Sequence, residues 1–323
     1  MKFNRIHLVI LLSVVSTSAL SASNHPDDHF SRTSVIVSDS NNNRMQRFTH
    51  EGEYQAQWGA LGAGNGQLNS PGGIGYDKEG NIYVADGLNN RVEVFSCKGE
   101  YVSQWGSFGT EPGQFNNPYA STVDRFGFVT VADTFNNRIQ QFTRTGKFIR
   151  QWGSLGSGDG QLNNPQAVTT DQHGHVFVAD GNNNRVEKFT HDGKYLLQWG
   201  TSGAGDGQFN LPIGLTTDGH GHVYVLDMNN NRVQKFKENG DFVTQWGIAG
   251  TANGQFSIPE DVSVDEKTGH VYIADSGNNR IQEFTEEGKF IRVWGTAGTG
   301  NAQFDSPDGI KFAVLPEKCR IKS

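Results

Sequence analysis

Cysteine, proline and charged residues are scarce in this sequence of 323 residues, and each scarcity narrows what the chain can be. The two cysteines, Cys97 and Cys319, are too few for cysteine-rich zinc modules or a dense disulfide framework. Charged residues make up 19% of the chain and the formal net charge is −7, which disfavours a broad surface for nucleic acid. Nine prolines and 41 glycines in a chain that is 35% hydrophobic indicate many tight turns rather than disorder.

The N-terminal residues have the pattern of an export signal. Lys2 and Arg5 precede an apolar run over residues 6–15, and small residues follow as far as Ser23. The run is about half the ~20 residues that a membrane-spanning helix needs, so cleavage is favoured over an uncleaved anchor. We therefore predict a signal peptide over residues 1–22, a linker over 23–33 and an extracytoplasmic protein, either periplasmic or secreted. No other stretch of the sequence is long and apolar enough to span a membrane.

One short segment, "VADGNNNRVEKF" at residues 178–189, recurs along the chain. Its leading aspartate appears six times, with spacings of 47 residues and a last spacing of 48, as Asp39, Asp86, Asp133, Asp180, Asp227 and Asp275. A residue set that every unit needs is structural rather than catalytic. Asparagine tolerates left-handed backbone, and the arginine is expected to return to the aspartate as a bidentate partner. The segment therefore predicts a turn between two strands.

Each repeat contains four short segments with strand character and turns every few residues. In the third complete unit these are residues 165–171, 175–180, 185–189 and 194–200. Four-stranded units at this period predict an all-β, six-bladed propeller over residues 34–314, followed by a C-terminal tail, 315–323. The last first strand, 307–314, is expected to pair with the N-terminal second strand, 34–39, and to close the ring. One tryptophan per unit is expected to pack between neighbouring blades: Trp58, Trp105, Trp152, Trp199, Trp246 and Trp294.

These motifs resemble the NHL-repeat propellers. The resemblance rests on "YVADGLNNRVEVF" (83–95), on the "QWG" that ends most of the fourth strands and on the "GQF" or "GQL" connection that leads to a proline. It covers about residues 34–314 and implies a six-bladed propeller. It does not fix the function, because such propellers include RNA-binding or protein-binding modules, sensor ectodomains and a peptide-amidating lyase.

Function is expected where the repeats differ from one another. Large apolar residues replace small or polar ones in the turns and connections of consecutive blades, at Leu61, Leu88, Phe108, Phe135 and Leu155. Exposed apolar patches of this kind often bind partners, so we predict a protein-binding or peptide-binding surface on this loop face. The alternative is that these side chains cover neighbouring loops.

A second variable set follows the prolines that begin the first strands and is expected at the mouth of the channel. It consists of Tyr119, Gln166, Ile213, Glu260 and Asp308, with Asp261 next in sequence. The acidic side is able to accept a cationic or polyhydroxyl group or a hard cation such as Ca²⁺. The alternative is ordinary solvated surface charge.

The histidines give only a weak metal signal. His175, His222 and His270 fall in the first hairpins of three consecutive units, on the face opposite the variable loops. They occupy the position of Asn81, an ordinary hairpin exit, so the prediction is that the protein has no metal and no cofactor. No pairing of a nucleophile with a base is recognisable in the sequence.

The last first strand lacks a residue that the others share. Ala313 stands where the earlier first strands end in an aspartate such as Asp77, and no hairpin follows it. Cys97 lies in a hairpin of the neighbouring blade, and Cys319 follows Ala313 closely. A disulfide between Cys97 and Cys319 that holds the ring closed is therefore a hypothesis.

Taken together, the sequence predicts an exported, non-enzymatic binding scaffold for a protein or peptide. The alternatives are a metal-dependent propeller lyase or hydrolase, a carbohydrate-binding protein that uses Tyr119 and the acidic mouth, and an RNA-binding protein. The acidity of the chain disfavours RNA, since phosphate contacts need clustered lysine and arginine.

Overall fold

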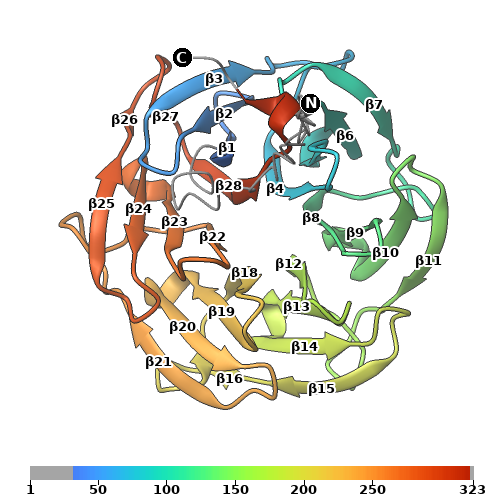
Figure 1. Cartoon of the computed structure of the whole chain (residues 1–323). Helices are drawn as coiled ribbons and strands as arrows, with labels where there is room; N and C mark the ends of the chain where they lie inside the picture. Colours follow the sequence, from blue (N-terminus) through green and yellow to red (C-terminus); the bar gives the residue numbers. More distant parts are fainter. Residues whose placement is uncertain (1–31, 321–323) are drawn as a thin grey trace, which may run out of the picture.

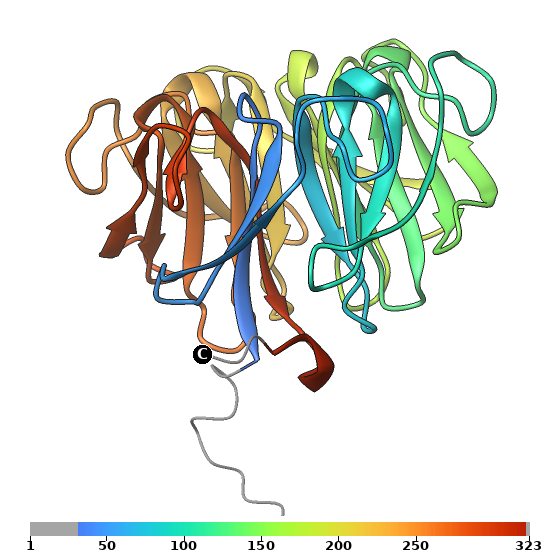
Figure 2. The ribbon, with the colours of Figure 1, turned by 90° about the horizontal axis from the view of Figure 1, so that it is seen from above.

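A computed structural model of the chain describes residues 32–320. Six four-stranded antiparallel sheets stand as blades around a central axis (Figure 1). Seen from the side, the strands run between the two faces of the ring (Figure 2). The predicted all-β, six-bladed propeller is confirmed. The predicted signal peptide and nearly all of the predicted linker lie outside the described residues, and no helix within 32–320 is long and apolar enough to cross a membrane.

Each blade places its first strand beside the axis and its fourth strand at the rim. For blades 1 to 6 in order, the first strands are β28 (Pro307–Val314), β4 (Pro71–Tyr76), β8 (Pro118–Val123), β12 (Pro165–Thr170), β18 (Pro212–Thr217) and β22 (Asp261–Val264). The second strands are β1 (Thr33–Asp39), β5 (Ile82–Asp86), β9 (Phe128–Asp133), β13 (Val176–Asp180), β19 (His222–Asp227) and β23 (Val271–Asp275).

The two outer strands of each blade follow in the same order. The third strands are β2 (Arg44–Phe48), β6 (Arg91–Phe95), β10 (Arg138–Thr143), β14 (Arg185–Phe189), β20 (Arg232–Lys237) and β24 (Arg280–Phe284). The fourth strands are β3 (Tyr54–Trp58), β7 (Tyr101–Trp105), β11 (Phe148–Trp152), β15 (Tyr195–Trp199), β21 (Phe242–Trp246) and β25 (Phe290–Trp294).

Short elements complete the chain. In blades 2 to 6 a 3-10 turn joins the second strand to the third: η1 (Gly87–Asn89), η2 (Thr134–Asn136), η3 (Gly181–Asn183), η4 (Met228–Asn230) and η5 (Ser276–Asn278). Two connections contain two-residue parallel pairs, β16 (Thr201–Ser202) with β17 (Gln208–Phe209) and β26 (Thr296–Ala297) with β27 (Gln303–Phe304). The 3-10 turn η6 (Glu317–Cys319) ends the described chain.

Burial decreases from the middle of each blade to its rim. All five residues of β5 are buried because neighbouring blades cover both of its faces, whereas β7 at the rim is buried nowhere along its length. The tryptophans pack between blades as predicted: Trp58 of blade 1 lies 6.1 Å, centroid to centroid, from Phe95 of blade 2. Gly99 lies beneath the same indole with φ +82°, and a Cβ there would approach Trp58 Cδ2 to 2.7 Å. A glycine in this hairpin therefore admits the tryptophan of the preceding blade.

The ring closes between its two chain ends. β28 pairs antiparallel with β1, with Val35 opposite Phe312, so blade 1 combines one C-terminal strand with three N-terminal strands. The backbone N–H of Leu315 donates to the carbonyl of Arg32 over 2.9 Å and extends this pairing. Leu315 and Cys319 are buried, so residues 315–320 of the predicted tail pack against the closing blades. Closure leaves no sheet edge between the first and last repeats.

The loops divide between two faces. We call the face with the 3-10 turns and the long connections between blades the loop face, and the face with the remaining hairpins the hairpin face. On the loop face, turns and connections bond to one another: the N–H of Leu88 donates to the carbonyl of Asn69, and the N–H of Phe135 donates to the carbonyl of Asn116.

Candidate functional site

The repeated Asp–Asn–Arg turn joins each blade to the connection that precedes it. In blade 2 the Asp86 carboxylate is fully buried and accepts from the Asn69 N–H (2.7 Å), Asn89 Nδ2 (2.8 Å) and Arg91 Nε (2.7 Å). Asn90 adopts the left-handed conformation with φ 55°, as predicted. The same arginine-to-aspartate contact of 2.7–2.8 Å occurs in all six blades. The motif therefore acts as structural support.

The arginine contact differs from the predicted bidentate pair. Only Nε of Arg91 reaches Asp86; the terminal nitrogens donate instead to carbonyls of the connection, including those of Ala63 at 2.8 Å and Gly64 at 3.1 Å. The prediction of a bidentate pair was wrong because the looping connection offers three carbonyls within reach of one guanidinium. The arginine thereby fixes the path of the connection as well as the turn.

The five apolar residues predicted on the loop face are all solvent-exposed. Their exposed fractions run from 56% to 70%, for Leu61, Leu88, Phe108, Phe135 and Leu155. Leu88 and Phe135 lie in η1 and η2, and the other three lie in the connections. The connection backbone is held next to the turns, since Asn89 Nδ2 donates to Gly62 O and Asn136 Nδ2 to Gly109 O, both at 2.8 Å. The side chains are thus presented on fixed backbone.

The loop face carries further apolar residues that sequence comparison did not single out. Ile248 is 62% exposed and Ile258 is 55% exposed, in the connection between blades 5 and 6. The exposed apolar residues of the loop face are therefore not confined to the first three connections and their turns.

The predicted channel-mouth residues come together at the loop-face end of the channel. Tyr119 of blade 3 spans the channel and donates its hydroxyl to Glu260 Oε2 on the opposite blade over 2.9 Å. Asp308 of blade 1 accepts a 3.5 Å hydrogen bond from Ser40 Oγ. A small cavity there is also lined by Gln166, Ile213 and Asp261. The Tyr119–Glu260 bond bridges this end of the channel.

The three carboxyl groups at this end are partly buried and are not the solvated surface charges considered above. Burial raises the pKa of Asp261 to about 7, although it accepts from the backbone N–H groups of Val262 and Ile310. Burial also raises the pKa of Glu260, and burial with the neighbouring carboxylates raises the pKa of Asp308 well above its ordinary range. The surroundings of the three carboxyl groups therefore favour their protonated forms more than water does.

The three candidate metal-binding histidines are each engaged by a carboxylate of their own blade. His175 Nδ1 lies 2.7 Å from Asp171 Oδ2, His222 Nδ1 lies 2.8 Å from Asp218 Oδ2 and His270 Nδ1 lies 2.7 Å from Glu283 Oε1. Within residues 32–320, one group has three potential metal ligands in reach of one another, and it contains only one of these histidines.

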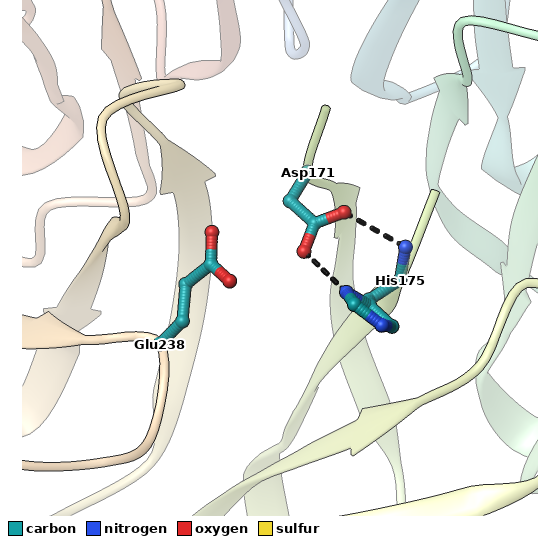
Figure 3. A group of neighbouring side chains, drawn as sticks. All are labelled: Asp171, His175 and Glu238. Atoms are coloured by element: carbon teal, nitrogen blue, oxygen red, sulfur yellow. Dashed lines mark hydrogen bonds and ion pairs between the residues drawn. The ribbon is translucent and has the colours of Figure 1, made fainter. Parts of the chain in front are cut away.

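That group consists of Asp171, His175 and Glu238 (Figure 3), with Glu238 approaching from the next blade. The ammonium of Lys188 already lies between the two carboxylates, 3.0 Å from Glu238 Oε2 and 3.9 Å from Asp171 Oδ2. It also lies 4.8 Å from the centroid of the Phe177 ring. The positive charge that this site attracts is thus supplied by the protein itself, and the arrangement is an inter-blade contact.

Cys97 and Cys319 form a disulfide in the structure, with their Cα atoms 5.5 Å apart. Both cysteines belong to one buried cluster with Ala313 and Leu315. The bond therefore joins the C-terminal segment after β28 to a hairpin of blade 2, across the closure of the ring.

A second cavity, larger than the one at the channel mouth, was not anticipated from the sequence. It opens on the hairpin face around the channel and has a volume of about 540 Å³. Thr122, Thr169, Thr216 and Lys311 line it, and they occupy the fifth position of their first strands. Counted from the proline of each repeat, the other residues at this position are Gly75 and Ser263, so Lys311 is the exception in a ring of small residues. The lysine at this position is visible when the repeats are aligned, and it was the one sequence feature that could have pointed to this cavity.

The comparisons with known proteins agree with this architecture. The family model described as NHL repeat matches residues 68–95, 162–189, 209–236 and 256–284. A search of curated proteins found no significant match.

Solved structures share the fold at low sequence identity. A protein of unknown function from Bacteroides caccae is 14% identical with a TM-score of 0.64, and the match covers 87% of this chain and 98% of that one. A streptogramin B lyase is 16% identical with a TM-score of 0.60, covering 86% and 83%. Catalytically inactive virginiamycin B lyase from Staphylococcus aureus, solved with quinupristin, is 16% identical with a TM-score of 0.58, covering 90% and 94%. These likenesses concern the fold alone. With four repeats matched by the family model and six blades of the same design, the chain is a six-bladed NHL-repeat β-propeller.

Proposed function

We propose that this propeller is an exported, non-enzymatic scaffold that binds a protein or peptide partner on its loop face. The observation that carries the proposal is the exposure of Leu61, Leu88, Phe108, Phe135 and Leu155 on hydrogen-bonded backbone. A soluble domain rarely leaves several large apolar side chains exposed on one face without use. Fixed backbone lowers the entropy lost on association, which favours binding.

The family and the N-terminal sequence support the same reading. NHL propellers commonly bind proteins, and the chain matches that repeat four times. The basic and apolar N-terminal pattern around Lys2 and Arg5 supports export, and a disulfide is the bond expected to persist in an oxidising compartment.

The proposal is tested with the purified mature protein as bait against the extracytoplasmic proteins of its source. Phe108→Asp and Phe135→Asp place charge in the centre of the apolar set, so the specific partner is expected to be lost while the melting temperature stays unchanged. Leu196→Asp is the matched control, because Leu196 is an exposed apolar residue of the rim strand β15. Equal retention of the partner by all three variants would refute loop-face binding.

Cell fractionation tests the export part separately. The chain with its own N-terminus is expected outside the cytoplasm with residues 1–22 removed, as read by N-terminal sequencing. Recovery of intact, cytoplasmic protein would contradict it.

A further inference from the structure

The cavity on the hairpin face has the form of a small-molecule site. Its volume of about 540 Å³ falls within the range of typical ligand pockets. The Tyr119–Glu260 bond crosses the channel at the other end, so the cavity is approached from the hairpin face and narrows towards the channel mouth.

The wall of the cavity offers unused hydrogen-bonding groups. Thr122, Thr169 and Thr216 project from the adjacent blades 3, 4 and 5, and each is at most 5% exposed. Among the described residues, none of these three hydroxyl groups has a hydrogen-bond partner, whereas Thr217 Oγ1 donates to Thr170 O at 3.0 Å. These hydroxyl groups line the cavity and are available to donate to or accept from a ligand hydroxyl.

Lys311 provides charge at the narrow end of the same cavity. It lines both this cavity and the small cavity at the channel mouth. Within residues 32–320 its ammonium makes no hydrogen bond and no ion pair within 4 Å. Burial lowers its pKa, while Asp261 and Glu266 favour the charged form. An ammonium that lines a cavity without a direct partner is able to attract an anion.

The rim of the cavity is also cationic where it meets solvent. Lys78, Arg125 and Lys267 are exposed there, against the single exposed acid Glu266. The three aspartates of the rim are buried and accept hydrogen bonds within their own hairpins, among them Asn81 N–H to Asp77 and Phe128 N–H to Asp124. The exposed charged groups of the rim are thus mainly positive, in a chain whose net charge is −7.

We propose that this cavity binds a small anionic polyhydroxyl compound, with its carboxylate or phosphate on Lys311 and its hydroxyl groups on the threonines. Lysine binds such anions as a point charge, and the threonine hydroxyls both donate and accept hydrogen bonds. The site is on the face opposite the protein-binding surface proposed above, so a partner and this ligand bind without competing.

Isothermal titration calorimetry with three defined probes tests the proposal: glucuronate, glucose 6-phosphate and neutral glucose. Saturable binding is expected for at least one of the two anions and not for glucose, and the affinity should fall as salt is added. The two anions distinguish a carboxylate site from a phosphate site.

Lys311→Met removes the charge and keeps the length of the side chain, and it is expected to weaken anion binding by roughly tenfold or more, the worth of one charge-assisted hydrogen bond. Lys194→Met, a change of an exposed lysine in a rim hairpin, is expected to bind as the parent protein does. If Lys311→Met fails to fold, the paired change Thr169→Val with Thr216→Val tests the hydroxyl contacts in its place, with the same direction of effect. Failure of both anions to bind, or equal affinity in the parent, the Lys311→Met protein and the threonine variant, would overturn the proposal.

Discussion

The loop-face turns and the first strands belong to the same six blades, yet they differ in how far they repeat. Every turn places a buried aspartate under the arginine five residues later, at 2.7–2.8 Å. The first strands and the residues just before them keep one proline per repeat but vary where they face the channel, with Tyr119 opposite Glu260 and Lys311 among threonines. Each turn holds its blade to a connection, and every blade needs that contact. The channel is shared by all blades, so a side chain such as Tyr119 or Lys311 is needed there only once.

The largest expected effect comes from breaking one of the repeated turns. Asp180→Ala would remove three hydrogen bonds, from Asn163 N–H, Asn183 Nδ2 and Arg185 Nε. The buried guanidinium would lose its 2.8 Å carboxylate partner and keep Glu187, 3.1 Å from Nη2. Loss of one member of a buried ion pair typically costs about 3–5 kcal/mol, so we expect a decrease of that size in the free energy of unfolding. Urea denaturation measures it.

Asp192→Ala is the matched control, since Asp192 is an exposed residue of a neighbouring hairpin and should change stability by less than about 0.5 kcal/mol. A loss at Asp180 no greater than that of the control would show that the repeated turn is not what holds the blade.

The ring closure gives the second largest effect. The disulfide joins residues separated by 222 positions, and cross-links over long loops typically contribute about 2–4 kcal/mol. The Cys97→Ala, Cys319→Ala protein is therefore expected to unfold at a lower urea concentration than the parent. Reductant should lower the unfolding midpoint of the parent and leave that of the double variant unchanged. Intact-mass analysis after thiol labelling, with and without reductant, checks the bond directly; two labelled thiols in the unreduced protein would contradict it.

A third prediction concerns a repeated buried position where charge differs between blades. The residue two after the turn arginine is glutamine in four blades, as at Gln140, which donates to Asp133 and Gln114. Blades 2 and 4 have Glu93 and Glu187 there instead, and burial raises the pKa of each to about 7. The folded protein then retains a proton that the unfolded chain has already lost, so stability present at low pH is lost as the pH rises through about 7.

Glu93→Gln and Glu187→Gln should each stabilise the protein by about 1 kcal/mol near pH 8 and have a smaller effect near pH 5. Thermal unfolding across that pH range measures the difference. Exposed Glu100→Gln, in a rim hairpin, is the control. Equal gains at both ends of the range would mean that the two carboxyl groups are ionised at every pH tested.

The sequence was sufficient for the blades and insufficient for the cavity. Six copies of one motif determine strands, turns and closure, and the period also brought Tyr119, Glu260 and Asp308 to one end of the channel. The prediction of a bidentate arginine–aspartate pair was wrong because the backbone path of a glycine-rich connection cannot be predicted from its sequence. The cavity was missed because its walls are ordinary threonines of inner strands, and its volume depends on how six blades tilt around the axis rather than on any residue alone. Lys311 carried a signal as the exception at its position, although the sequence did not show that space lay beside it.

The smallest expected effect separates the apolar loop residues from the scaffold beneath them. Leu88 stands where three other blades have asparagine. Two of these, Asn182 and Asn229, donate to Asn163 Oδ1 and Asn210 Oδ1 at 3.1 and 3.2 Å. Leu88→Asn can form the same bond with Asn69, so the free energy of unfolding should stay within about 0.5 kcal/mol of the parent value. A marked loss of stability would mean that Leu88 covers a neighbouring loop, the alternative considered for the whole apolar set. An unchanged fold with weaker partner binding would instead show that variation among the turns serves recognition, while their repetition serves the ring.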